Sequence, residues 1–175
     1  EHELAKHKPG QFFAVIVDNE EVSEPSRVLR VQETTARLLN VPSRNVHVRV
    51  FADKATGVES GKRRYGEIVG IMVQTMNGKL HQTAIQNIIF LQAKIITENP
   101  AIARVFYTVK ELPEKKPYVI GIRSVQTKDF LTATVSELPW TTLDKIGEEI
   151  VELCPNVSTV YYDVTPKPPA TIEME

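Results

Sequence analysis

Apolar residues recur along the chain with two spacings, one typical of strands and one typical of helices. Apolar or alternating runs of strand length cover FFAVIVD after Gln11 and residues 46–52, 67–76, 103–109, 118–127 and 158–164. Apolar positions spaced as on one helix face cover residues 25–39, 82–98 and 140–154. The predicted order is therefore strand, helix, strand, three times in succession.

The three successive segments share further features that indicate an internal repeat of roughly 55 residues. Each helix is followed by a proline, at Pro42, Pro100 and Pro155. A unit of two strands and one helix cannot close its own core, so the units must pack together. We predict an α+β fold: three repeated strand-helix-strand units forming a mixed or antiparallel sheet with helices packed on one face.

The unit boundaries divide the chain into three parts. Residues 1–53 hold the first unit, residues 54–110 a basic loop and the second unit, and residues 111–175 the third unit with its tail. Whether the units share one sheet or form two subdomains stays open. Strands with apolar residues on both faces, FFAVIV and YVIGI, need cover on each side, so we expect a homodimer.

Composition excludes several classes of function. The 21 basic and 22 acidic residues give a net charge of −1, so we expect neither nucleic-acid nor membrane binding. No apolar run approaches the roughly 20 residues that span a bilayer. The single cysteine, Cys154, allows no intrachain disulfide and no cysteine metal cluster. The interpretation is a cytoplasmic protein.

Motifs for catalysis are missing from the sequence. It contains no glycine-rich phosphate loop followed by Lys-Ser or Lys-Thr, no serine elbow and no zinc-ligand spacing. We therefore predict no catalytic residue and no metal site in this chain.

A cationic segment, KATGVESGKRRY at residues 54–65, is the candidate for phosphate binding. Its candidate phosphate-binding residues are Lys54, Gly57, Lys62, Arg63 and Arg64. Such cations grip phosphate through charge-assisted hydrogen bonds, and backbone amides at glycines can assist them. A solvated basic loop explains the same composition, and the residues alone do not decide between the two.

The C-terminal segment, VSTVYYDVTPKPPATIEME, joins an alternating strand to a proline-rich tail. Pro168 and Pro169 are expected to hold the tail extended and to present Lys167 on one side. The tail resembles the end of the GMP synthase family, YDxTxKPPxTIEWE, and the likeness runs to Glu175. It departs at Met174, where the family has tryptophan.

Two other stretches resemble the same family. Gly57-Val58, Arg63 and Tyr65 match KxVGVxGDxRxY, in which Ser60-Gly61 replaces the family's Gly-Asp pair. Residues 122–133, IRSVQTKDFLTA, are similar to LRAVxTxDFMTA. The resemblance implies an XMP site in which the cations meet the phosphate and Glu173 accepts hydrogen bonds from the nucleotide. The residues it implies for that site are Arg63, Lys167, Thr171, Ile172 and Glu173.

The resemblance further implies the dimerisation and XMP-binding portion of GMP synthase, as a fragment or a stand-alone relative. The family enzyme uses ATP, Mg²⁺ and glutamine-derived ammonia. This chain lacks the ATP-pyrophosphatase and glutaminase motifs, so we expect it to bind no cofactor alone and to act with an ATP-pyrophosphatase domain or subunit. The alternatives are a stand-alone nucleotide-binding regulatory module and a purely structural oligomerisation domain.

Overall fold

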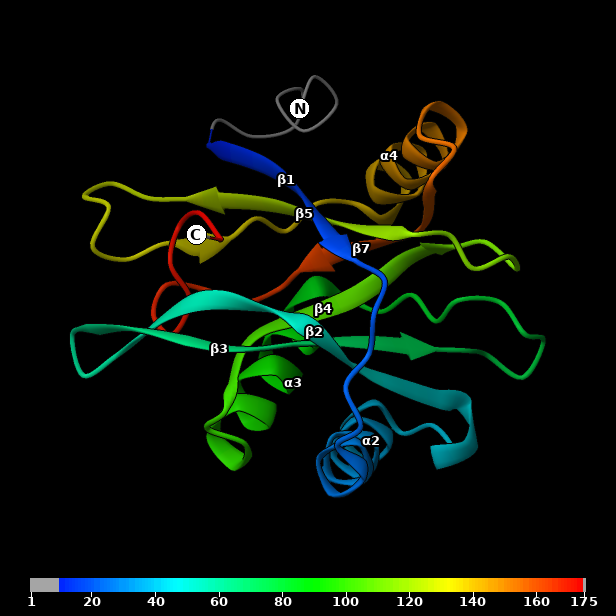
Figure 1. Cartoon of the computed structure of the whole chain (residues 1–175), viewed down its shortest axis with the longest axis horizontal. Helices are drawn as coiled ribbons and strands as arrows, with labels where there is room; N and C mark the ends of the chain where they lie inside the picture. Colours follow the sequence, from blue (N-terminus) through cyan, green and yellow to red (C-terminus); the bar gives the residue numbers. More distant parts are fainter. Residues whose placement is uncertain (1–9, 175) are drawn as a thin grey trace.

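The computed structural model describes residues 10–174 and has the predicted α+β fold (Figure 1). Glu175, where the likeness to the family ends, lies outside the described residues. The helices are α2 (Pro25–Leu39), α3 (Ile85–Glu98) and α4 (Trp140–Leu153), with a short 3₁₀ turn η1 (Ser43–Asn45). The strands are β1 (Gln11–Asp18), β2 (Val46–Glu59), β3 (Lys62–Val73), β4 (Ile102–Glu111), β5 (Tyr118–Gln126), β6 (Thr134–Val135) and β7 (Val157–Asp163). None of the helices in this range is long and apolar enough to cross a bilayer.

The strands form one mixed sheet with the order β1-β5-β7-β4-β3-β2, and β6 pairs with β5. The neighbours β3 and β4 are parallel, as are β5 and β7, whereas β1–β5, β7–β4 and β3–β2 are antiparallel. The predicted units therefore share a single sheet.

The second and third units have the same connectivity, and the first differs. In β3-α3-β4 and in β5-α4-β7 a helix connects two parallel neighbouring strands. In the first unit, α2 instead leads from β1 at one edge of the sheet to β2 at the opposite edge. We expected each unit to place its two strands next to each other, and only the second and third units do so.

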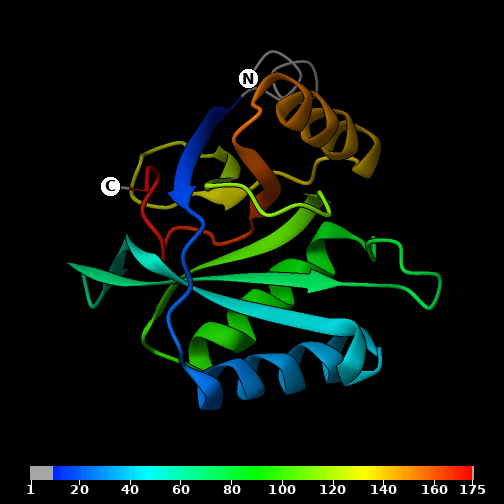
Figure 2. The same ribbon diagram turned by 45° about the vertical axis from the view of Figure 1, so that its right-hand side comes forward.

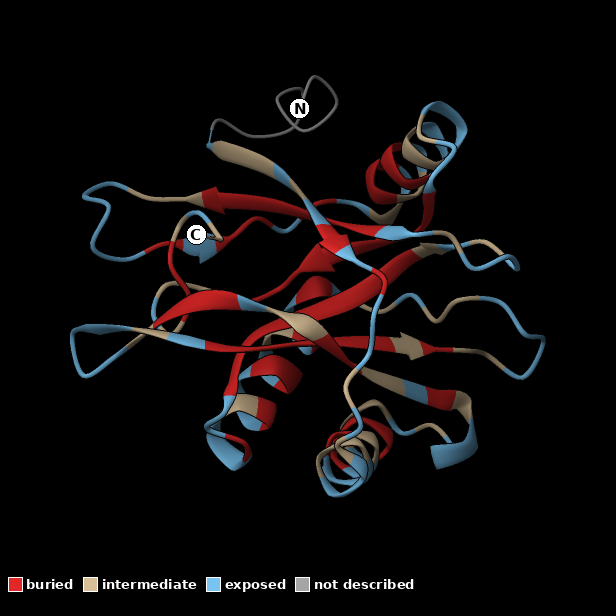
Figure 3. Cartoon of the chain, in the orientation of Figure 1, coloured by how far each residue is buried: buried red, intermediate tan, exposed pale blue. Residues whose placement is uncertain are grey.

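All three helices pack on the same face of the sheet, as predicted. Figure 2 shows α2 and α3 next to each other and α4 apart from them. Their apolar faces contribute Val31 from α2, Leu91 and Ile95 from α3, and Leu143 from α4 to one hydrophobic core. The outward faces of these helices stay exposed (Figure 3). Because the apolar positions recur at helical spacing, each helix gains stability from burying one face.

The opposite face of the sheet, here called the concave face, holds a second core built on aromatic rings. The Tyr161 ring lies 5.8 Å from Phe51 and 5.7 Å from Phe106, measured between centroids. The residues that follow β1 reach the edge strand β2, where the Val22 amide donates to the Val50 carbonyl at 2.9 Å. Because Gly121 has no side chain, the Phe106 ring can lie directly against its backbone.

The segment predicted as a basic loop is instead part of a long hairpin. β2 and β3 pair from Lys54↔Glu67 out to Glu59↔Lys62, and only Ser60-Gly61 forms the turn. Both turn residues have positive φ, 50° at Ser60 and 74° at Gly61, as a tight two-residue hairpin turn requires. The cations consequently lie on strands and alternate between the two faces of the hairpin.

Replacing Gly121 by alanine tests the packing of the concave face. The added Cβ would lie 2.6 Å from Phe106 Cζ, so we expect the free energy of unfolding to fall by about 1–3 kcal/mol. Urea denaturation measures the change. In a Phe106→Leu background the loss should shrink, and an unchanged stability of Gly121→Ala alone would contradict this account of the packing.

Candidate functional site

The tail after β7 runs back over one end of the concave face and is held by backbone hydrogen bonds on two sides (Figure 1). On one side, Lys167 and Ala133 exchange two backbone bonds of 3.0 Å. On the other, the β2 amides of Thr56 and Val58 donate to the Met174 and Pro169 carbonyls at 3.0 and 2.6 Å. The tail therefore connects the hairpin to the segment before β6.

The prolines do not hold the tail extended, and that expectation was wrong. The chain turns at this point, and the Ala170 amide donates to the Pro166 carbonyl at 2.9 Å. The turn brings residues 171–174 back over the concave face, where an extended tail could not reach.

Beneath the tail lie two arginines and one aspartate that are removed from water. Arg104 in β4, Arg123 in β5 and Asp163 at the end of β7 are 0%, 1% and 0% exposed. Asp163 Oδ2 lies 2.9 Å from Arg104 Nη1 and 3.1 Å from Arg123 Nη1. Strand alternation places all three on the concave face, because their sequence neighbours Val105, Ile122 and Val164 belong to the core under the helices.

The two guanidinium groups also bind the tail itself. Arg104 Nη2 donates to Thr171 Oγ1 and to the Glu173 carbonyl, both at 2.6 Å, and to the Thr56 carbonyl at 3.2 Å. Arg123 donates to the carbonyls of Thr165, Thr171 and Ile172 at 2.6, 2.8 and 2.8 Å. Buried charges persist in proteins when they are paired and hydrogen-bonded. The tail supplies most of the acceptors, and Arg104 Nε is the one nitrogen of the two guanidinium groups that has no partner within the described residues.

The cluster carries an excess of positive charge. Its two cations face one carboxylate, and the remaining acceptors are neutral carbonyls and a hydroxyl. Burial lowers the pKa of Arg123, and neighbouring Arg104 acts in the same direction while Asp163 opposes both. An anion near the tail would be favoured by this charge.

A pocket of about 340 Å³ lies between the hairpin, the tail and the turn before β6. It brings together all five residues predicted to bind XMP. They are Arg63, Lys167, Thr171, Ile172 and Glu173, and the lining also includes Gln11, Val58 and Phe130. A second pocket of about 280 Å³, lined partly by Phe13, Gly121 and Met174, shares Glu173 with the first.

The charged side chains of the pocket differ in the hydrogen bonds that they form with other described residues. The Arg63 side chain is exposed and has no ion pair or hydrogen bond with residues 10–174. Lys167 Nζ donates to the Phe130 carbonyl, which leaves two further N–H donors. Glu173 uses its carbonyl to hold the tail, and its exposed carboxylate forms no ion pair within the described residues.

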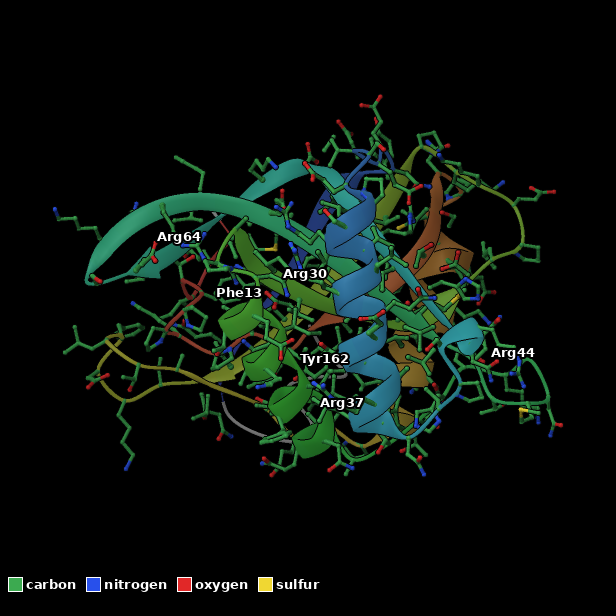
Figure 4. The ribbon with its side chains drawn as sticks, turned by 90° about the horizontal axis from the view of Figure 1, so that it is seen from below. Phe13, Arg30, Arg37, Arg44, Arg64 and Tyr162 are labelled. Atoms are coloured by element: carbon green, nitrogen blue, oxygen red, sulfur yellow. The ribbon has the colours of Figure 1, made fainter. Side chains whose placement is uncertain are left out.

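The other candidate phosphate residues do not line this pocket. Lys54 Nζ lies 3.8 Å from Glu67 Oε1, and Arg64 donates to the Ile102 carbonyl at 2.9 Å. Gly57 packs against the tail, where a Cβ would lie 3.1 Å from the Pro169 carbonyl, and Lys62 is exposed. Figure 4 shows Arg64 on the hairpin formed by β2 and β3. The cations of residues 54–65 are therefore not gathered at one site.

Sequence reasoning missed the roles of the buried cluster. Arg123 and Asp163 occurred only as letters within the stretches that resemble the family, and Arg104 was not singled out. The available signal was a lone arginine inside an otherwise apolar strand, ARVFYTV or YVIGIRSV. Within residues 10–174 no group of three metal-ligating side chains lies together.

The fold and site define an α+β domain whose own C-terminal segment closes a pocket lined by cations. Residues 114–174 match the family described as GMP synthase C terminal domain. A subunit of glutamine-hydrolysing GMP synthase from Sulfurisphaera tokodaii is 33% identical over 175 residues, which are 100% of this chain and 40% of that protein. The corresponding subunit from Saccharolobus solfataricus is 37% identical over 143 residues, or 82% of this chain and 35% of that protein.

A glutamine-hydrolysing GMP synthase from Mesoplasma florum is 55% identical over 58 residues, which are 33% of this chain and 11% of that protein. The chain thus spans well under half the length of these curated relatives, 40% of the first. Through its third unit and tail it belongs to the GMP synthase C-terminal domain family.

Replacing Asp163 by asparagine tests the buried cluster. The change leaves two guanidinium groups without their carboxylate, so we expect the free energy of unfolding to fall by about 3–5 kcal/mol. Asp144→Asn is the control at a half-buried position where asparagine can still accept a hydrogen bond from Gln82 Nε2, with an expected change within about 0.5 kcal/mol. Equal effects of the two substitutions in urea denaturation would contradict the role assigned to Asp163.

Proposed function

We propose that this chain is the XMP-binding and dimerisation portion of a GMP synthase and that it acts in guanine nucleotide biosynthesis. The observation that carries the proposal is the pocket in which Arg63 of the hairpin meets Lys167 and Glu173 of the tail. These residues are far apart in the sequence, and the fold gathers them at one place. The family match of residues 114–174 supports the same function.

The proposed binding mode follows from the chemistry of these side chains. Arg63 offers a planar fork of donors to phosphate oxygens, and Lys167 adds a second cation. The Glu173 carboxylate accepts hydrogen bonds from N–H or O–H groups of the nucleotide. The neighbouring pocket next to that carboxylate is lined by apolar Phe13 and Met174 and also by Arg123.

Amination of XMP would require a further catalytic domain or subunit. The proposed partner is an ATP-pyrophosphatase, which would bind ATP and Mg²⁺, while this chain contributes the nucleotide site. The relatives from Sulfurisphaera tokodaii and Saccharolobus solfataricus are named as subunits, which is consistent with an enzyme of more than one chain. The stand-alone regulatory module remains the alternative, and it would bind XMP without such a partner.

A dimer interface is proposed on the edge strand β1. Ile16 is 65% exposed, and Tyr118 on the same side of neighbouring β5 is 37% exposed. Apolar side chains at a sheet edge favour association with another chain. This surface supports the purely structural oligomerisation domain as a second candidate, and the two functions can coexist.

Calorimetric titration with XMP tests the nucleotide site. Lys167→Ala and Arg63→Ala should each weaken binding about 10-fold to 100-fold, since each removes a charge-assisted hydrogen bond to phosphate. Lys62→Ala removes an exposed cation of the same hairpin that lies outside the pocket, and it is the matched control. GMP and inorganic phosphate serve as comparison ligands.

Loss of affinity in both pocket variants, with the control unchanged, would support the proposal. No binding of XMP by the wild-type chain, or equal losses in all three variants, would contradict it.

Sedimentation equilibrium tests the dimer. We expect the wild-type chain to self-associate and Ile16→Glu to be monomeric, because a charge on the apolar edge opposes its burial. Leu29→Glu, on the exposed face of α2, is the matched control and should still dimerise. A monomeric wild-type chain would contradict the interface.

A further inference from the structure

We propose that Arg104 and Arg123 are positioning residues that set the geometry of the nucleotide pocket through the backbone of the tail. The inference rests on the proposed function of that pocket. Neither guanidinium lines the pocket of about 340 Å³ beside Arg63, yet every tail residue from Thr171 to Glu173 that lines it is hydrogen-bonded to one or both of them.

The hydrogen bonds fix consecutive residues of the tail. Carbonyls of Thr171 and Ile172 accept from Arg123, and the Glu173 carbonyl accepts from Arg104. Three successive carbonyls thus point toward the buried cluster. Their hydrogen bonds fix the backbone of residues 171–173 and therefore the positions of the Cα atoms that carry these side chains. A free tail would lose this conformation to chain entropy.

Arg104 also determines how far the two halves of the pocket lie apart. Its Nη2 donates to the Thr56 carbonyl on the hairpin as well as to Thr171 and Glu173 on the tail. Arg63 lies on the same hairpin, paired with Val58 two residues beyond Thr56. One buried group therefore connects the element that carries Arg63 with the element that carries Glu173.

The chemistry of the cluster favours positioning over simple stabilisation. Burying ion pairs is costly, and apolar side chains of similar volume often stabilise a core as well or better. What an apolar core cannot do is orient a run of backbone carbonyls. The forked, planar guanidinium supplies several donors in a fixed geometry, which lysine does not.

The test uses the whole chain with Arg123→Met, Arg123→Lys and Arg104→Met. Each methionine variant keeps one arginine opposite Asp163, so the remaining buried pair is neutral. Arg49→Met is the matched control. It removes a partly buried arginine on β2 that bonds Asn19, Tyr161 and Glu21 and not the tail.

The first readout is hydrogen exchange at the Thr56 and Val58 amides, which donate to the tail carbonyls of Met174 and Pro169 and report tail docking without any ligand. We expect their exchange to accelerate at least about tenfold in the Arg104 and Arg123 variants, while Leu91 and Ile95 of α3 keep their protection. Arg123→Lys should behave like Arg123→Met, because it restores the charge and not the fork.

The second readout is XMP affinity, which should fall at least about tenfold in the same variants and stay unchanged in Arg49→Met. Unchanged exchange at Thr56 and Val58, equal acceleration in α3, or full rescue by lysine would overturn the positioning role. If the wild-type chain binds no XMP, the proposed function fails, and the exchange readout still decides whether the arginines hold the tail.

Discussion

Two positive charges and one negative charge lie in the interior of this domain with almost no exposure to water, and much of the structure at this end follows from satisfying them. Asp163 neutralises one of the two arginines. The other acceptors are backbone carbonyls and the Thr171 hydroxyl of the C-terminal tail, and the Thr56 carbonyl of the hairpin. Undocking the tail would leave these donors unpaired, so the tail belongs to the core of the fold.

This requirement connects the sheet to the pocket. The pleat places Arg104, Arg123 and Asp163 on the face opposite the helices, and the tail must fold back to reach them. Lys167 and Glu173 then arrive beside Arg63, which the long hairpin brings from the edge of the sheet. The nucleotide site that we propose depends on the hydrogen bonds by which the buried arginines hold the tail in place.

Periodicity in the sequence predicted the helices and the α+β class well, because each helix buries one face. It could not show that α2 leads to the far edge of the sheet, since strand order depends on contacts distant in sequence. The hairpin was taken for a loop because Gly57 and Gly61 suggested turns, although only Ser60-Gly61 turns. The residues of the pocket were found by resemblance, whereas the arginines beneath them needed the structure.

Amide chemical-shift mapping of the chain during titration with XMP tests most directly whether the hairpin and the tail form a nucleotide site. We expect shifts concentrated in residues 57–64 of the hairpin, 128–133 of the adjoining turn and 167–174 of the tail. Shifts confined to the separate pocket around Glu111 and Lys115, at the other end of β4, would contradict it, as would a titration without shifts.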